Sequence, residues 1–125
     1  MKVSCGTDII EIERIKNSIE DMGEAFLNRV YTKKEIAYCE SRKKQKYQHY
    51  AARFAAKEAT FKAISTILND KYSITWKDIE VENSKQGRPS VNLYGIKGEE
   101  KIENIDISIS HCKEYAVANV VILYK

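Results

Sequence analysis

The sequence predicts an α+β fold, in which an antiparallel sheet packs against one long central helix. Residues 51–69 contain no Gly and no Pro and are rich in Ala, as expected of a long helix. Residues 105–110 alternate Ile with Asp or Ser, which is the period of a half-buried strand. Residues 115–124 form the most apolar run and predict a buried strand that follows after a tight connection. The order of strand, helices and two hairpins therefore favours the α+β class.

The chain begins with a strand and two short helices. Residues 3–10 predict a strand that runs into a turn or a helix. Residues 11–22 carry apolar side chains at positions 12, 15, 19 and 22, which is the spacing of an amphipathic helix, and Gly23 is placed to end it. Residues 24–31 predict a short helix with its apolar side chains turned inward.

A capping box and a basic run lie between these elements and the long helix. Thr32 and Glu35 have the spacing of a capping box, so a third helix is expected to start there and to continue to about Ser41. Residues 42–46 include four basic side chains and no acidic one. A solvated helix end or loop is favoured over a binding patch for this run. The long helix is expected to begin near Tyr47.

A change of period after the long helix predicts a hairpin. Residues 74–81 are rich in β-branched and aromatic side chains and predict its first strand. Residues 84–89 have the composition of a turn and contain the only proline. Residues 90–94 alternate and predict the returning strand, and residues 96–103 predict a short polar helix.

Length, charge and cysteine content limit the class of protein. A chain of 125 residues is expected to form a single domain, residues 1–125. The net charge of +3 permits an acidic partner but does not require nucleic acid. No apolar run is long enough to span a membrane, and no secretory signal precedes the first strand. Three scattered cysteines without a CxxC pair favour free thiols in the cytoplasm.

Two acidic residues are ambiguous when they are considered alone. Asp8 follows Gly6 and Thr7 where the first strand gives way to the helix, so it is expected to be a helix N-cap, although a strand end also suits a metal ligand. Glu58 and Lys62 share one face of the long helix with aromatic neighbours. An exposed ion pair is the simpler interpretation of their spacing. The alternative is that Glu58 binds a cation and Lys62 neutralises a phosphate.

The familiar nucleotide-binding and hydrolase motifs are absent, so the candidate chemistry depends on Asp8, Glu58, Lys62 and His111. Two carboxylates suit Mg²⁺, which takes its other oxygen ligands from phosphates and water. A lysine and a histidine nearby would balance phosphate charge. Transfer or cleavage at a pyrophosphate fits this set. On spacing alone His111 is as well explained as a structural residue.

Four stretches resemble the holo-[acyl-carrier-protein] synthase family, a branch of the 4′-phosphopantetheinyl transferases. They are GTDIIEIERI at 6–15, RFAAKEATFKA at 53–63, GRP at 87–89 and SISHCKEYAVA at 108–118. Their order and spacing match the family across nearly the whole chain. The resemblance implies the 4′-phosphopantetheinyl transferase fold and transfer of phosphopantetheine from coenzyme A to a serine of apo acyl carrier protein. Adenosine 3′,5′-bisphosphate is the second product.

The resemblance also implies catalytic and metal-binding roles. Asp8 and Glu58 would be the ligands of Mg²⁺, and Glu58 or a metal-held water would take the serine proton. Lys62 would contact the phosphates and stabilise the leaving group. His111 would lie beside the phosphates of the nucleotide. Together Glu58, Lys62 and His111 form the expected catalytic set.

The remaining implied roles concern coenzyme A and protein partners. Arg53 would be a further phosphate contact, and Gly87, Arg88 and Pro89 would lie along the nucleotide, largely through the backbone. The family's short members are trimers with active sites between subunits, so a homotrimer is expected. Family members dock the acidic carrier protein on a basic first helix, and here Arg14 is the expected contact.

This docking helix departs from the family pattern, because acidic residues interrupt it. Glu20, Asp21 and Glu24 reduce its positive charge, although Lys16, Arg29 and the 42–46 run add to Arg14.

Two other functions stay open when the residues are considered without the family resemblance. One is that of a different Mg²⁺-dependent enzyme, which acts on another nucleotide pyrophosphate. The other is that of a non-catalytic binding module, for instance one that binds RNA. The scattered tyrosines and small net charge weigh against RNA.

Overall fold

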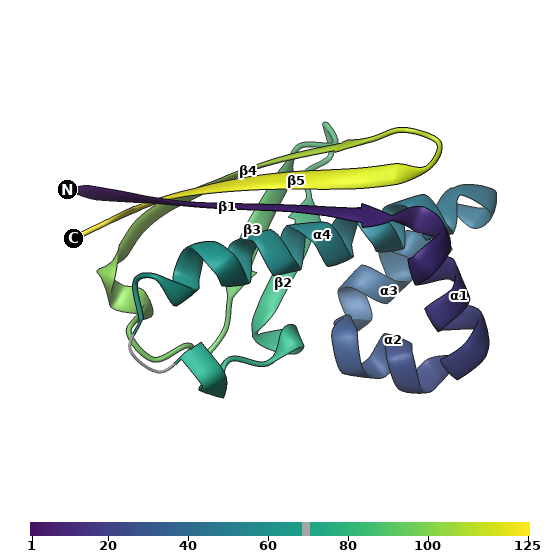
Figure 1. Ribbon diagram of the computed structural model, residues 1–125, viewed down its shortest axis with the longest axis horizontal. Coiled ribbons are helices and arrows are strands. Elements are labelled where there is room, and N and C mark those ends of the chain that lie inside the picture. The colour runs from purple at the N-terminus through teal and green to yellow at the C-terminus, as the bar shows by residue number, and fades with distance from the viewer. Residues whose placement is uncertain (69–70) are drawn as a thin grey trace.

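A computed structural model describes residues 1–68 and 71–125 and shows a sheet with one long helix beneath it (Figure 1). The strands are β1 (Lys2–Glu11), β2 (Ile79–Asn83), β3 (Pro89–Leu93), β4 (Ile102–His111) and β5 (Tyr115–Tyr124). The α-helices are α1 (Ile12–Met22), α2 (Glu24–Val30), α3 (Lys33–Glu40) and α4 (Lys46–Ser65). Short 3₁₀ turns cover Lys43–Gln45, Lys71–Ser73, Trp76–Asp78 and Glu99–Lys101. No helix among the described residues is long and apolar enough to cross a membrane.

The main sheet is antiparallel and has the strand order β1-β5-β4, so the apolar β5 lies in the middle. Asp8 on β1 is opposite Ala118, which is opposite Ile109 on β4. Two residues further along β1, Ile10 is opposite Ala116, which is opposite His111. Asp8 and His111 therefore lie near the same end of the sheet but on its two edge strands. The β2–β3 hairpin forms a separate antiparallel pair.

Small residues let α4 approach the sheet closely. Gly6 on β1 sits against α4 so tightly that a Cβ atom would lie 1.9 Å from the carbonyl oxygen of Ala59. Two residues earlier, the Ser4 hydroxyl donates to the carbonyl of Ala63 at 2.7 Å. Residue numbers rise along β1 as they fall along α4, so the helix runs antiparallel to this strand.

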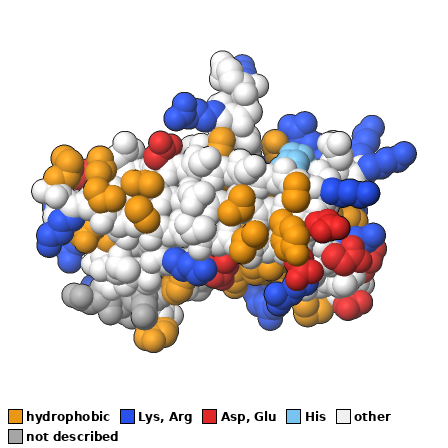
Figure 2. Space-filling view, turned by 45° about the horizontal axis from the view of Figure 1, so that its top comes forward, with side chains coloured by type: hydrophobic (Ala, Val, Ile, Leu, Met, Phe, Trp, Pro, Cys, Tyr) orange, Lys and Arg blue, Asp and Glu red, His pale blue; other side chains and the backbone are white. Residues whose placement is uncertain are grey.

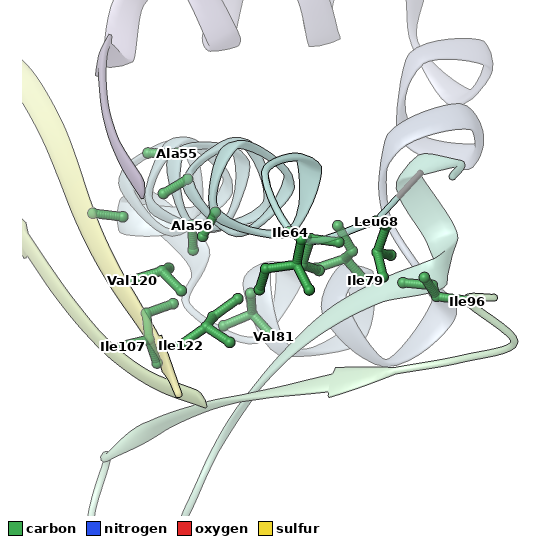
Figure 3. Close-up of a cluster of buried hydrophobic side chains, with 14 residues drawn as sticks. Ala55, Ala56, Ile64, Leu68, Ile79, Val81, Ile96, Ile107, Val120 and Ile122 are labelled. Atoms are coloured by element: carbon green, nitrogen blue, oxygen red, sulfur yellow. The ribbon is translucent and has the colours of Figure 1, made fainter. Parts of the chain in front are cut away.

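The side chains that α4 turns inward connect both sheets. Ala55, Ala56 and Ile64 pack against the sheet residues Ile107, Val120 and Ile122, with Ile79 and Val81 of β2 beyond them (Figure 3). A second cluster joins α1, α2 and α3 to the first half of α4, through Tyr31, Tyr50 and their neighbours. Because α4 supplies side chains to both clusters, it organises the whole molecule.

A buried ion pair fixes α3 to α4. Lys57 donates to Glu35 Oε1 at 2.6 Å, and neither side chain is exposed to solvent. Glu35 also accepts from the backbone N–H of Thr32 at 2.9 Å and from that of Val81 at 2.8 Å. The predicted capping box is confirmed, and its glutamate additionally ties α3 to β2. Burial lowers the pKa of Lys57, while the Glu35 carboxylate opposes that shift.

Two of the predicted elements are wrong in detail. The first strand of the hairpin begins at Ile79, because Thr75 and Asp78 close a 3₁₀ turn in which the Asp78 side chain accepts from the Thr75 N–H at 2.9 Å. Of the helix predicted at 96–103, only Glu99–Lys101 is helical, since Ile102 already pairs with β5. The long helix ends at Ser65, and position 69, where it was expected to end, lies outside the described residues.

Candidate active site

Two carboxylates and a lysine meet where β1 passes the exposed face of α4. Asp8 is half-buried and, by strand alternation, points to the same side of the sheet as Gly6, toward α4. Lys62 donates to Asp8 Oδ1 at 3.1 Å and to the carbonyl of Thr7 at 3.0 Å. Glu58 lies one turn before Lys62 on the same face of the helix. The antiparallel path of α4 along β1 therefore brings together residues that are distant in the chain.

The Asp8 carboxylate acts on the pKa of Glu58. Burial raises this pKa above its ordinary value of 4.5, and the nearby Asp8 carboxylate raises it further, while Lys62 lowers it. Two carboxylates beside a single ammonium leave a net negative charge in a partly desolvated place. Such a site favours a bound cation.

The donor set fits Mg²⁺. Mg²⁺ is typically bound by one or two carboxylates and completes its octahedron with waters and substrate phosphates. Among the residues the structure describes, no group of three or more His, Cys, Asp or Glu side chains could hold a metal ion. Asp8 and Glu58 could supply two carboxylate ligands and leave the other positions to phosphate oxygens and water.

A cavity of about 410 Å³ opens beside Glu58. Its walls are largely apolar, with Phe61 and Trp76 prominent, and Arg29 contributes a cationic group. Trp76 also stacks on Phe54, with 4.9 Å between ring centroids. The cavity provides room for a substrate directly next to the carboxylate pair.

A second set of polar side chains surrounds Arg53. Arg53 is 3% exposed, and its guanidinium donates to Asn83 Oδ1 at 2.7 Å. Asn83 in turn donates to the carbonyl of Gly87 at 3.1 Å. Gly87 has a φ of +83°, which glycine adopts without strain, at the exposed tip of the β2–β3 hairpin. Arg53 is thus linked to the turn that carries Gly87 and Arg88.

Other predicted contacts lie close to this second set. His111 is the last residue of β4 and is exposed, with its ring centroid 6.1 Å from that of His49. Arg88 is exposed and is 3.8 Å from Asp106 on β4. Pro89 begins β3. In Figure 2, basic side chains gather around a histidine at the upper right of the molecule.

The two sets of residues lie on different sides of α4. Successive residues of an α-helix are rotated by about 100°, so Arg53 is about 140° and His49 about 180° from Glu58 around the axis. Lys62 contacts β1, whereas Arg53 contacts β2. Within one chain, the width of the helix separates the carboxylates from the arginine and histidines.

The sequence matches a known protein superfamily over nearly its whole length. A family model described as the 4′-phosphopantetheinyl transferase superfamily matches residues 4–120. The chain belongs to this superfamily. A curated superfamily relative, the holo-[acyl-carrier-protein] synthase of Ruminiclostridium cellulolyticum, is 47% identical over 127 residues, covering 98% of this chain and 92% of the relative.

Solved structures confirm the expected transferase fold. The holo-[acyl-carrier-protein] synthase of Helicobacter pylori in complex with coenzyme A has a TM-score of 0.81 at 29% identity, covering 95% of this chain and 99% of that one. The holo-(acyl-carrier-protein) synthase of Bacillus anthracis in complex with CoA (3′,5′-ADP) has a TM-score of 0.76 at 35% identity, covering 98% and 96%.

The structure of this superfamily member corrects two sequence-based interpretations of its site. Asp8 is no helix cap, because β1 continues to Glu11 and that residue takes the N-cap position of α1. Among the described residues, the ion pair of Lys62 is with Asp8 and not with Glu58. Sequence reasoning did not single out His49 or Asn83. The spacing of His49, four residues before Arg53 on the helix, was the available signal for the first of them.

Proposed function

We propose that this protein transfers 4′-phosphopantetheine from coenzyme A to a serine of apo acyl carrier protein. The products are holo acyl carrier protein and adenosine 3′,5′-bisphosphate. The observation that carries the proposal is the meeting of Asp8, Glu58 and Lys62 in a member of this superfamily. Two carboxylates for a metal and one ammonium for a phosphate are what a reaction at a pyrophosphate requires.

Each residue has a task in this reaction. Asp8 and Glu58 would hold Mg²⁺, which would neutralise negative charge on the pyrophosphate. The serine oxygen forms a bond to the phosphorus that bears pantetheine, and the bond from that phosphorus to the bridging oxygen breaks. Glu58 or a water beside it takes the serine proton. Lys62 stabilises the negative charge on the departing bisphosphate.

Mass spectrometry of apo carrier protein tests this function directly. Incubation with coenzyme A, Mg²⁺ and the protein should add one phosphopantetheine to a serine. Dephospho-coenzyme A and NAD, offered separately, distinguish a transferase that prefers coenzyme A from an enzyme that acts on other pyrophosphates. An unchanged carrier mass with every donor would contradict the proposal.

A homotrimer with shared active sites fits two features of the single chain. The sites around Glu58 and around Arg53 and His111 are separated by α4, so the closely spaced phosphates of one coenzyme A cannot reach both within one chain. The face of the main sheet turned away from α4 carries exposed apolar side chains, among them Val3, Ile9 and Val121, and hydrophobic patches are visible there in Figure 2. Such a face favours contact with another copy.

Mixing two inactive variants tests whether the site is shared. Glu58→Gln removes one half of the site, and a combined Arg53→Gln, His111→Gln variant removes the other. If one subunit supplies Glu58 and its neighbour supplies Arg53 and His111, random exchange in a 1:1 mixture leaves about a quarter of the sites intact. Transfer activity should therefore reappear after subunits are exchanged. A mixture as inactive as its components, after exchange is verified by native mass spectrometry, would place the whole site in one chain.

Arg14 is the proposed contact for the acidic carrier protein. It is exposed on α1, whose outer face also carries Glu13, Glu20 and Asp21. Arg14→Glu should raise the KM for carrier protein by about tenfold and leave the KM for coenzyme A nearly unchanged, because a rim charge acts on one partner only. Glu13→Lys, the matched change beside it, should lower the KM for carrier protein. Equal effects of Arg14→Glu on both KM values would remove Arg14 from the docking surface.

Residues 1–125 are proposed to act as a single domain in the cytoplasm. Both hydrophobic clusters depend on α4, so neither part of the chain has a core of its own. Cys5, Cys39 and Cys112 are free thiols, which suits a reducing compartment.

A further inference from the structure

Three basic side chains pack against Tyr38 on the side of α4 that faces α3, and a fourth, His111, lies against one of them. The Arg53 guanidinium lies 3.9 Å from the centre of the Tyr38 ring, and the Arg42 guanidinium lies 4.7 Å from it. Arg42 also donates to the Tyr38 hydroxyl at 3.0 Å. His49 meets the same ring edge-on at 5.5 Å, and His111 meets His49 edge-on at 6.1 Å. We call Arg42, His49, Arg53 and His111 the basic cluster.

The basic cluster has no counter-charge of its own. In the described parts of the chain, the ion pairs join other residues, so no carboxylate lies within ion-pair distance of any of the four. Arg53 is almost completely buried, and its Nε atom has no hydrogen-bond partner. Burying a cation with an unused donor costs free energy unless an anion satisfies it. The cluster is therefore built like an anion site.

His49 is the titratable member whose surroundings are most clearly defined. It is half-buried and faces Tyr38 from α3, Arg42 from the segment after α3, Arg53 from its own helix and His111 from β4. Burial lowers its pKa below the ordinary value of 6.5, and Arg42, Arg53 and His111 lower it further. His49 is consequently neutral near pH 7 as long as no anion neutralises the positive charges around it.

We propose that His49 completes, with Arg42, Arg53 and His111, a site for the ribose phosphate of coenzyme A, and that it holds this phosphate as an imidazolium. This inference depends on the proposed function for the identity of the ligand. A phosphate monoester has a second pKa near 6 and carries two negative charges above pH 7. Bound among the four side chains, it supplies the missing counter-charge and favours protonation of His49.

The consequence is that binding of this phosphate takes up a proton. Above pH 7 the phosphate is already dianionic, so affinity for the phosphate should fall as pH rises and protonated His49 becomes harder to form. Dephospho-coenzyme A lacks the phosphate and should show no such pH dependence. Selectivity for coenzyme A over its dephospho form is thus greatest near neutral pH and decreases under alkaline conditions.

Calorimetric titration without carrier protein isolates this effect, because no transfer can occur. The measured quantity is the ratio of the Kd of dephospho-coenzyme A to that of coenzyme A, at pH 7.0 and at pH 8.5. For the unmodified protein the ratio should fall by about fivefold or more across this range, as expected of one linked proton. In His49→Gln it should be about tenfold lower at pH 7.0, through loss of a charge-assisted hydrogen bond, and nearly constant with pH.

Two further variants make the result specific to His49. Lys46→Gln removes a charge from the same helix, but Lys46 pairs with Glu40 at 3.4 Å and is outside the basic cluster, so its pH dependence should match the unmodified protein. His111→Gln should weaken coenzyme A binding but keep the decrease with pH. A decrease retained in His49→Gln would overturn the proposal. Failure of carrier modification by mass spectrometry would instead refute the proposed function, since these titrations do not depend on transfer.

Discussion

Replacing Glu58 by glutamine is expected to lower the rate of carrier-protein modification by about a thousandfold or more, because the site loses a metal ligand and a candidate proton acceptor together. The amide keeps the shape of the side chain but carries no negative charge. Asp8→Asn should have a similar effect, since Asp8 is the other proposed ligand. Initial rates measured by mass spectrometry of the carrier protein give the comparison.

The stability of these variants distinguishes lost chemistry from lost folding. Burial and the neighbouring Asp8 both disfavour the charge on Glu58. Glu58→Gln should therefore unfold at the same temperature as the unmodified protein or at a slightly higher one. Glu100→Gln, an equivalent change at an exposed position at the far end of β4, should change neither property. If Glu58→Gln or Asp8→Asn retained more than about a tenth of the activity, that residue would be no essential ligand.

Gly6→Ala is expected to destabilise the protein by about 3 kcal/mol or more, the upper range for overpacking. The added methyl would lie 1.9 Å from the Ala59 carbonyl oxygen and 2.9 Å from its carbonyl carbon, and these backbone atoms cannot rotate away. The strand would have to move off the helix. Because Asp8 follows two residues later, transfer activity should fall as well. Thermal and urea unfolding measure the first effect, and carrier modification measures the second.

A second substitution tests the cause of this destabilisation. Ala59→Gly removes a side chain but not the carbonyl that causes the clash, so it should not rescue Gly6→Ala. Thr7→Ala, on the exposed side of β1, should cost no more than about 1 kcal/mol through loss of its hydrogen bond to Asn119. Unfolding curves of Gly6→Ala that matched those of Thr7→Ala would show that β1 does not depend on this close contact.

Local sequence signals predicted most of the elements, and they failed where side chains satisfied the backbone in another way. The capping box at Thr32 and the stop at Gly23 are visible as residue types and were confirmed. The residues before Ile79 have strand-like composition, but the Asp78 carboxylate binds the Thr75 N–H and closes a turn. Propensity describes average surroundings and cannot anticipate one such hydrogen bond.

The site was harder to predict than the fold, because it depends on contacts between distant segments. Spacing along the helix placed Glu58 and Lys62 on one face, but only the path of β1 brings Asp8 to Lys62. The resemblance to a family assigns roles to these three residues without reference to this contact. It did not show that Arg53 and His111 lie across the helix from them, since that separation follows from the order of strands and the rotation of α4.

The alanine-rich face of α4 does not by itself fix the register of the helix against β1, on which the pairing of Glu58 with Asp8 depends. Ala55, Ala59 and Ala63 repeat every four residues, so this nearly smooth surface offers similar packing after slippage by four residues, about 6 Å. Such slippage would bring Phe54 or Lys62 to the place of Glu58. The Glu35–Lys57 pair and the Ser4 hydroxyl can be satisfied in one alignment only, and they select it. Buried polar contacts outside the active site thus fix the register of α4 against β1, and with it the position of Glu58 beside Asp8.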